Sequence, residues 1–162
     1  MKNIKLELKW AIYFVIMQLF WMLFEKSAGL YTLQIEKHAT YSNFIAIPAI
    51  AVYVLALLDK RSNFYEGTMT YLQGFITGLM ITVFVTLLSP IVQYIVSVGI
   101  APEFFPNMIK YSVENGKMTQ DAAEKYFNLK NFIVQGMMFT PVMGIVTTLF
   151  VTVFVKKKSK EQ

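Results

Sequence analysis

Four long apolar stretches dominate this chain, and its charged residues lie between the stretches or at their ends. The stretches can be drawn at Trp10–Gly29, Ala39–Leu58, Tyr71–Ile100 and Phe132–Val155. A helix needs ~20 mostly apolar residues, at ~1.5 Å each, to cross ~30 Å of hydrocarbon. The chain is 56% hydrophobic, more than a soluble domain of 162 residues needs to bury. The sequence therefore predicts an all-α fold, an integral membrane four-helix bundle that forms a single domain over residues 1–162.

The charges are divided unequally between the two sides of this predicted bundle. If the four helices alternate in direction, the side with both termini carries nine basic and four acidic residues, a net charge of +5. The other side carries six of each and is neutral. Lys and Arg near the ends of spans are retained in the cytoplasm, so we expect both termini to be cytoplasmic. The lipid bilayer is the expected partner of this positive charge, and the sequence shows no basic and aromatic pattern typical of nucleic-acid binding.

The first apolar stretch also has features of a secretory signal peptide, because small residues follow it at Ser27 and Ala28. Glu25 and Lys26 are unfavourable directly before a cleavage site, and cleavage would leave the termini on opposite sides, so we favour an uncleaved helix. The uninterrupted apolar run, Trp10–Phe24, is 15 residues long, or roughly 22 Å. Crossing the membrane should therefore draw Glu25 into the outer boundary of the bundle.

Burial of Glu25 would be costly without a partner. We expect the partner to be a cation from the neighbouring sequence or from the segment between the third and fourth spans. The candidates are Lys26, Lys110 and Lys130.

Prolines and glycines inside the spans predict how the helices bend and pack. Kinks are expected at Pro48, Pro90 and Pro141. Glycine allows close approach between helices, and the candidate packing positions are Gly74, Gly78, Gly136 and Gly144. We favour packing within one chain over a dimer face.

Residues 102–130, between the third and fourth spans, are predicted to form a short extracytoplasmic helical hairpin. Pro106 suits a first helical position, Asn115 and Gly116 suit a helix end, and Thr119 suits the N-cap of a second helix. Several aromatic residues of this segment fit the level of the lipid headgroups. We expect the hairpin to lie at the outer interface and cap the bundle.

Candidate chemistry is confined to the outer end of the first two spans, where four polar residues could converge: Glu25, Lys26, Glu36 and His38. An acid beside an imidazole is the minimum for proton transfer or a weak metal site. A structural role is nevertheless favoured, because one histidine in a chain without cysteine gives no metal-ligand pattern. We assign no catalytic residue, no metal site and no cofactor.

A resemblance covers nearly the whole chain. It is carried by Trp21–Leu30, Ile35–His38, Gly74–Leu79, Ile100–Pro106, Met118–Phe127 and Met143–Ile145. In order and spacing these segments resemble the uncharacterised bacterial membrane family called domain of unknown function 4199. One departure is Tyr31, where relatives often show a histidine. The resemblance implies a four-helix protein of the bacterial inner membrane and implies no activity.

Three classes of function remain open from the sequence. A structural or interaction protein, such as an accessory subunit or a homo-oligomer, is favoured because the helices carry few polar residues. A small transporter would need an oligomer and a buried carboxylate, which only Glu25 could supply. A membrane enzyme acting on lipid or envelope precursors would rest on Glu25, Glu36 and His38.

Overall fold

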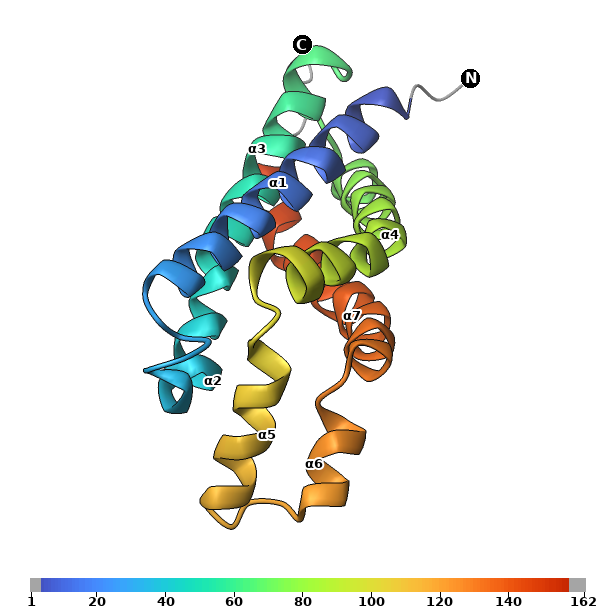
Figure 1. Ribbon diagram of the computed structural model, residues 1–162. Helices are drawn as coiled ribbons and strands as arrows, with labels where there is room; N and C mark the ends of the chain where they lie inside the picture. Colours follow the sequence, from blue (N-terminus) through green and yellow to red (C-terminus); the bar gives the residue numbers. More distant parts are fainter. Residues whose placement is uncertain (1–3, 158–162) are drawn as a thin grey trace.

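The computed structural model describes residues 4–157, and it is built from helices (Figure 1). The long helices are α1 (Lys5–Ser27), α3 (Ala46–Asn63), α4 (Tyr71–Ile95) and α7 (Leu129–Val155). The shorter ones are α2 (His38–Tyr41), α5 (Phe104–Glu114) and α6 (Gln120–Tyr126). Two 3₁₀ turns, η1 (Ile35–Lys37) and η2 (Ser42–Ile45), flank α2, and a π-helical segment, η3 (Val96–Ile100), extends α4.

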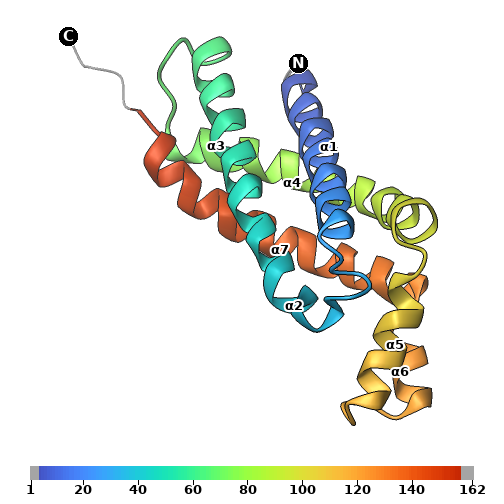
Figure 2. The same ribbon diagram turned by 60° about the vertical axis from the view of Figure 1, so that its left-hand side comes forward.

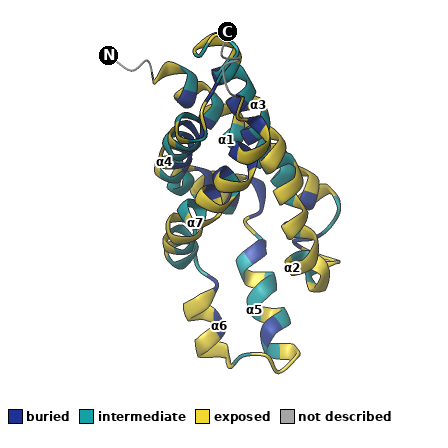
Figure 3. Cartoon of the chain, turned by 180° about the vertical axis from the view of Figure 1, so that it is seen from behind, coloured by how far each residue is buried: buried dark blue, intermediate teal, exposed yellow. Residues whose placement is uncertain are grey.

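Four helical stretches are long and apolar enough to cross a membrane: Lys5–Ser27, Ile35–Asn63, Tyr71–Ile100 and Leu129–Val155. This confirms the predicted all-α bundle with four candidate spans. Many large apolar side chains of these helices are exposed, and Figure 3 colours the exposed residues yellow. Phe154, for example, is 84% exposed and Phe150 is 67% exposed. Such a surface is stable in contact with lipid rather than water.

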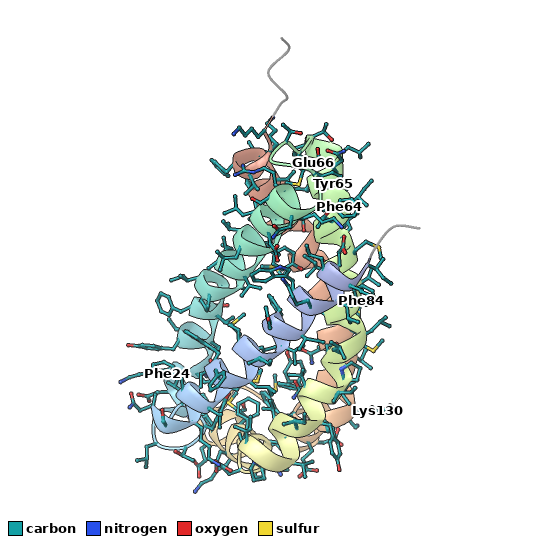
Figure 4. All side chains as sticks on the ribbon, turned by 90° about the horizontal axis from the view of Figure 1, so that it is seen from above. Phe24, Phe64, Tyr65, Glu66, Phe84 and Lys130 are labelled. Atoms are coloured by element: carbon teal, nitrogen blue, oxygen red, sulfur yellow. The ribbon has the colours of Figure 1, made fainter. Side chains whose placement is uncertain are left out.

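The two ends of the bundle differ. The start of α1, the end of α7 and the connection from α3 to α4 lie at one end, and α5 and α6 form a hairpin that projects from the other (Figures 1 and 2). We call these the terminal end and the hairpin end. Figure 4 shows Phe64, Tyr65 and Glu66 at the terminal end, with Phe24 and Lys130 towards the opposite end.

The helices α4 and α7 form the tightest pair, because small residues of one face threonines of the other. A Cβ atom added to Gly78 would lie within 3.0 Å of Thr148, and one added to Gly144 would lie within 3.0 Å of Thr82. The threonine hydroxyls donate to carbonyl oxygens one turn earlier in their own helices, Thr82 to Gly78 at 2.9 Å and Thr148 to Gly144 at 2.7 Å. The polar atoms at this contact are therefore satisfied while the helices approach closely.

Of the other two expected packing positions, one makes a similar close contact and the other does not. Gly74 continues it, since an added Cβ would lie 2.7 Å from Cγ2 of Thr152. Gly136 does not, because an added Cβ there would meet nothing within 4 Å. The close contact expected at Gly136 is therefore absent.

The prolines occupy different positions in their helices. Pro48 is the third residue of α3, where a proline is tolerated in the first turn, and it closely follows the 3₁₀ turn η2. Pro90 and Pro141 lie inside α4 and α7. Figure 1 shows the first half of α4 nearly end-on and its second half crossing the view, so the helix changes direction along its length.

The hairpin follows most of its predicted start and stop signals. Asn115 is the C-cap of α5, Gly116 has a φ of 63°, and the Thr119 side chain accepts a hydrogen bond from the Ala122 amide at the start of α6. The helix α5 begins at Phe104, so Pro106 is its third residue rather than its first.

Candidate functional site

A cavity of about 250 Å³ opens at the hairpin end of the bundle. Segments that are distant in sequence line it: α1, the α1–α2 connection, the start of α2, η2, the end of α4, η3, α5 and the start of α7. Its polar lining residues are Gln18, Glu25, His38, Ser42, Gln93 and Ser97. Its aromatic lining residues, apart from His38, are Trp21, Tyr31, Phe104 and Phe132. Gln18 lies seven residues before Glu25 on α1, so the cavity extends about 10 Å along that helix.

Glu25 is the acidic residue of this cavity, and it is only 3% exposed. The indole Nε1 of Trp21 donates a hydrogen bond to its Oε1 at 2.8 Å, and the hydroxyl of Tyr31 donates to its Oε2 at 2.5 Å. Trp21 precedes Glu25 by four residues, which places both side chains on one face of α1. The burial expected for Glu25 is therefore present, and its hydrogen-bond donors are neutral.

Tyr31 reaches Glu25 because the chain reverses directly after α1. Gly29 has a φ of 73°, and the amide of Leu30 donates to the Glu25 carbonyl oxygen at 3.0 Å, closing the helix end. This turn returns Tyr31 over the last turn of α1. Burial raises the pKa of the Tyr31 phenol, and the hydrogen bond to Glu25 raises that pKa further, so the phenol remains a donor.

The cations proposed as partners of Glu25 point elsewhere, so that expectation is wrong. The Lys26 ammonium donates to the carbonyl oxygen of Ile100 and lies 3.9 Å from a carboxylate oxygen of Glu103. Lys110 lies 3.9 Å from Glu114 on its own helix, and Lys130 is exposed. Lys26 therefore attaches the end of α1 to η3 and α5 and leaves the Glu25 carboxylate to neutral donors.

His38 shares the cavity with Glu25, whereas Glu36 does not. The His38 ring lies 4.8 Å from the ring centroid of Phe104 and 5.4 Å from that of Tyr31. No described residue hydrogen-bonds to its imidazole. Glu36 lies exposed on η1, outside the lining. Of the four polar residues expected to converge, the cavity brings together Glu25 and His38 only.

Sequence reasoning missed two further polar features of this end. Tyr31 was noted only for its departure from the family pattern, although it is buried and bonded to Glu25. Ser42 has a buried hydroxyl with no hydrogen-bond partner among the described residues, and it lines the same cavity. An unpartnered hydroxyl in a lining leaves a donor and an acceptor for a ligand or water.

The terminal end holds a second buried carboxylate, Glu7, with different surroundings. One carboxylate oxygen lies 2.7 Å from the Lys60 ammonium, and the two residues are 5% and 3% exposed. The Lys60 ammonium also lies 3.8 Å from the ring centroid of Phe64. Beside this pair, Asp59 accepts hydrogen bonds from Lys9 and Trp10, both at 2.6 Å. Ionic and polar side chains close this end.

The side chains of this site do not form a recognisable set of metal ligands. Among residues 4–157, no group of three histidine, cysteine, aspartate or glutamate side chains is placed to hold a metal ion. Glu25 and His38 alone would leave a metal ion short of protein ligands. The cavity is better suited to an organic group that hydrogen-bonds to a carboxylate and packs against aromatic rings.

Comparison with known proteins agrees with the resemblance noted in the sequence. No curated protein and no solved structure matches the chain. The family described as "Protein of unknown function (DUF4199)" matches residues 9–157. This match covers all four candidate spans almost completely and includes every residue that lines the cavity. The chain therefore belongs to the domain of unknown function 4199 family.

Proposed function

We propose that this protein is a non-catalytic membrane protein that binds a small ligand in the pocket at its hairpin end and serves as an accessory or sensory subunit. One observation carries the proposal. Glu25, a buried carboxylate that pairs with no cation among the described residues, lines a cavity of about 250 Å³. Binding pockets are concave, mostly apolar and equipped with a few convergent polar groups, and this cavity has that composition.

Transport by a single chain is less well supported. The pocket lies at the hairpin end, and the bundle beyond it is packed with apolar residues such as Leu57, Ile81 and Val85. The terminal end is then closed by Glu7 and Lys60. A transporter needs access to its binding site from both sides in turn, which would require a large rearrangement of the tight α4–α7 pair.

An enzyme is also less well supported, because neither serine of the pocket lining is hydrogen-bonded to a base. A serine nucleophile needs a base within hydrogen-bond reach of its hydroxyl. The hydroxyl of Ser42 has no hydrogen-bond partner among the described residues, so His38 does not activate it. Glu36, expected as a third member, is exposed and outside the pocket.

The hairpin supports the second part of the proposal, an interaction role. It projects beyond the four long helices (Figure 2), and it contacts the pocket through Phe104. Asn107 on α5 donates a hydrogen bond to the Tyr31 carbonyl oxygen at 2.8 Å. A ligand that rearranges Tyr31 could therefore change the position of the hairpin, and a second copy or another membrane protein could detect that change.

Filling the pocket tests the proposal without knowledge of the ligand. Ser97→Phe places a ring in the cavity, and Val98→Phe adds the same ring to the neighbouring residue, which is exposed and outside the lining. Protein extracted with its native lipids would be examined by native mass spectrometry for molecules that co-purify. We expect a bound species with the wild type and Val98→Phe and its loss from Ser97→Phe. The same bound species on all three proteins, or on none, would contradict the proposal.

A further inference from the structure

The charge of the pocket restricts the ligand, if the pocket binds one as proposed above. Its lining includes one acidic side chain, Glu25, and no lysine or arginine. Among the described residues, only the neutral donors Trp21 and Tyr31 hydrogen-bond to this carboxylate. A carboxylate oxygen can accept more than one hydrogen bond, so Glu25 retains capacity for a further donor. Anionic ligands are disfavoured, because no described lysine or arginine lines the cavity.

The aromatic lining of the pocket restricts the ligand further. Four aromatic residues and His38 line it, and the rings of Tyr31, His38, Phe104 and Phe132 contact one another in a cluster. The ring centroids of Tyr31 and Phe104 are 5.3 Å apart, and those of Phe104 and Phe132 are 5.8 Å apart. Aromatic faces attract cations, and clusters of such rings bind alkylated ammonium groups. A hydrated metal ion would gain little from these walls, whereas an organic cation would bury its alkyl groups against them.

We propose that the pocket binds an organic ammonium group, with Glu25 as its counter-charge and the rings of Trp21, Tyr31, Phe104 and Phe132 packed around its alkyl substituents. The cavity of about 250 Å³ lies below the ~300 Å³ typical of pockets for drug-sized ligands, so the group is small. Two sources share this chemistry. One is a free alkylammonium compound, and the other is the ammonium headgroup of a membrane lipid.

The fluorescence of Trp21 offers a direct test. The chain contains two tryptophans, and Trp10 lies at the terminal end, bonded to Asp59. In a Trp10→Phe background the signal therefore reports on the pocket. Choline chloride would be titrated into this protein in nanodiscs of phosphatidylglycerol, with sodium chloride at equal ionic strength as the control. We expect a saturable change with choline and none with sodium.

Two variants link that change to the pocket. Glu25→Gln removes the counter-charge and should weaken choline binding about tenfold or more, whereas Glu36→Gln, an acid outside the pocket, should leave it unchanged. Phe132→Leu keeps the charge and removes one aromatic wall, with an expected loss of about tenfold. It provides an independent test if Glu25→Gln does not fold, as judged by circular dichroism.

Adding phosphatidylethanolamine to the nanodiscs distinguishes the two sources. If the lipid headgroup occupies the pocket, the apparent affinity for choline should fall as the fraction of this lipid rises. If the ligand is a free compound, the affinity should stay constant. Absence of a saturable choline signal, or a signal unaffected by both Glu25→Gln and Phe132→Leu, would overturn the assignment. Loss of a co-purifying molecule from Ser97→Phe would in that case leave the binding function standing with a different ligand class.

Discussion

Both ends of α1 carry a buried carboxylate, but the two are satisfied in different ways. Glu7 and Glu25 are 18 residues apart, which is five helical turns at 3.6 residues per turn, so they lie on the same face of α1. Glu7 contacts the buried ammonium of Lys60 at 2.7 Å. Glu25 accepts hydrogen bonds from an indole and a phenol and borders a cavity. Glu7 is therefore paired with a cation of the same chain, although its Oε2 has no hydrogen-bond partner among the described residues. Glu25 has only neutral partners among those residues, and the cavity beside it leaves room for a cation from outside.

This difference suggests separate roles for the two carboxylates. Breaking a buried ion pair leaves an uncompensated charge and strongly destabilises a fold. A carboxylate held by neutral donors loses less when it is replaced by an amide, because the amide oxygen still accepts hydrogen bonds. Glu7 therefore belongs to the structure of the terminal end, and Glu25 belongs to the pocket.

The largest expected difference between the two ends is in their accessibility from outside the cell. The chain has no cysteine, so single cysteines can be introduced at exposed residues, Ser62→Cys at the terminal end and Lys117→Cys on the hairpin. From the charge distribution we expect an impermeant thiol reagent to label Lys117→Cys in intact cells and Ser62→Cys only after permeabilisation. The reverse pattern would place the pocket on the cytoplasmic side. Asn3 and Ser159, the termini to which this orientation also applies, lie outside the described residues.

Removing the cation at the terminal end should cost the most stability. Lys60→Met leaves Glu7 buried without its partner, and we expect a loss of about 3–5 kcal/mol in the free energy of unfolding. The double variant Glu7→Met, Lys60→Met should recover most of that loss, since it replaces the ion pair by apolar side chains of similar length. Denaturant unfolding in detergent measures all three proteins. Equal stability of Lys60→Met and the wild type would mean that the ion pair contributes nothing.

A smaller loss is expected at the α4–α7 contact, which supports both ends. Gly78→Ile forces a branched side chain against Thr148, and overpacking of this kind costs about 1–3 kcal/mol. Gly136→Ile is the matched control, because nothing lies within 4 Å of the added Cβ. Thermal unfolding should separate the two variants. Similar melting temperatures would show that the contact tolerates added bulk.

The sequence was sufficient to predict the helices and much of the hairpin, because hydropathy and capping residues act locally. Asn115, Gly116 and Thr119 serve as helix end and N-cap as expected. Burial of Glu25 also followed from a local fact, the short apolar run before it. The first apolar stretch was drawn from Trp10, whereas α1 begins five residues earlier, at Lys5, so Glu7 lay outside the predicted span.

Contacts between distant segments could not be predicted in the same way. Lys26 was one candidate partner of Glu25, but it contacts the Ile100 carbonyl oxygen of η3 and Glu103, the N-cap of α5. Tyr31 reaches Glu25 only because the backbone reverses at Gly29. The contact between Trp21 and Glu25 could have been predicted from the sequence. Trp21 precedes Glu25 by four residues, the spacing at which side chains meet on a helix.

The difference between the two carboxylates can be measured most directly by comparing Glu7→Gln with Glu25→Gln in the same membrane. Denaturant unfolding of each variant gives its free-energy change relative to the wild type. We predict that Glu7→Gln loses about 3 kcal/mol, because Lys60 is left buried without its counter-charge, and that Glu25→Gln loses about 1 kcal/mol or less. Equal losses, or a larger loss for Glu25→Gln, would contradict the assignment of Glu7 to structure and Glu25 to the pocket.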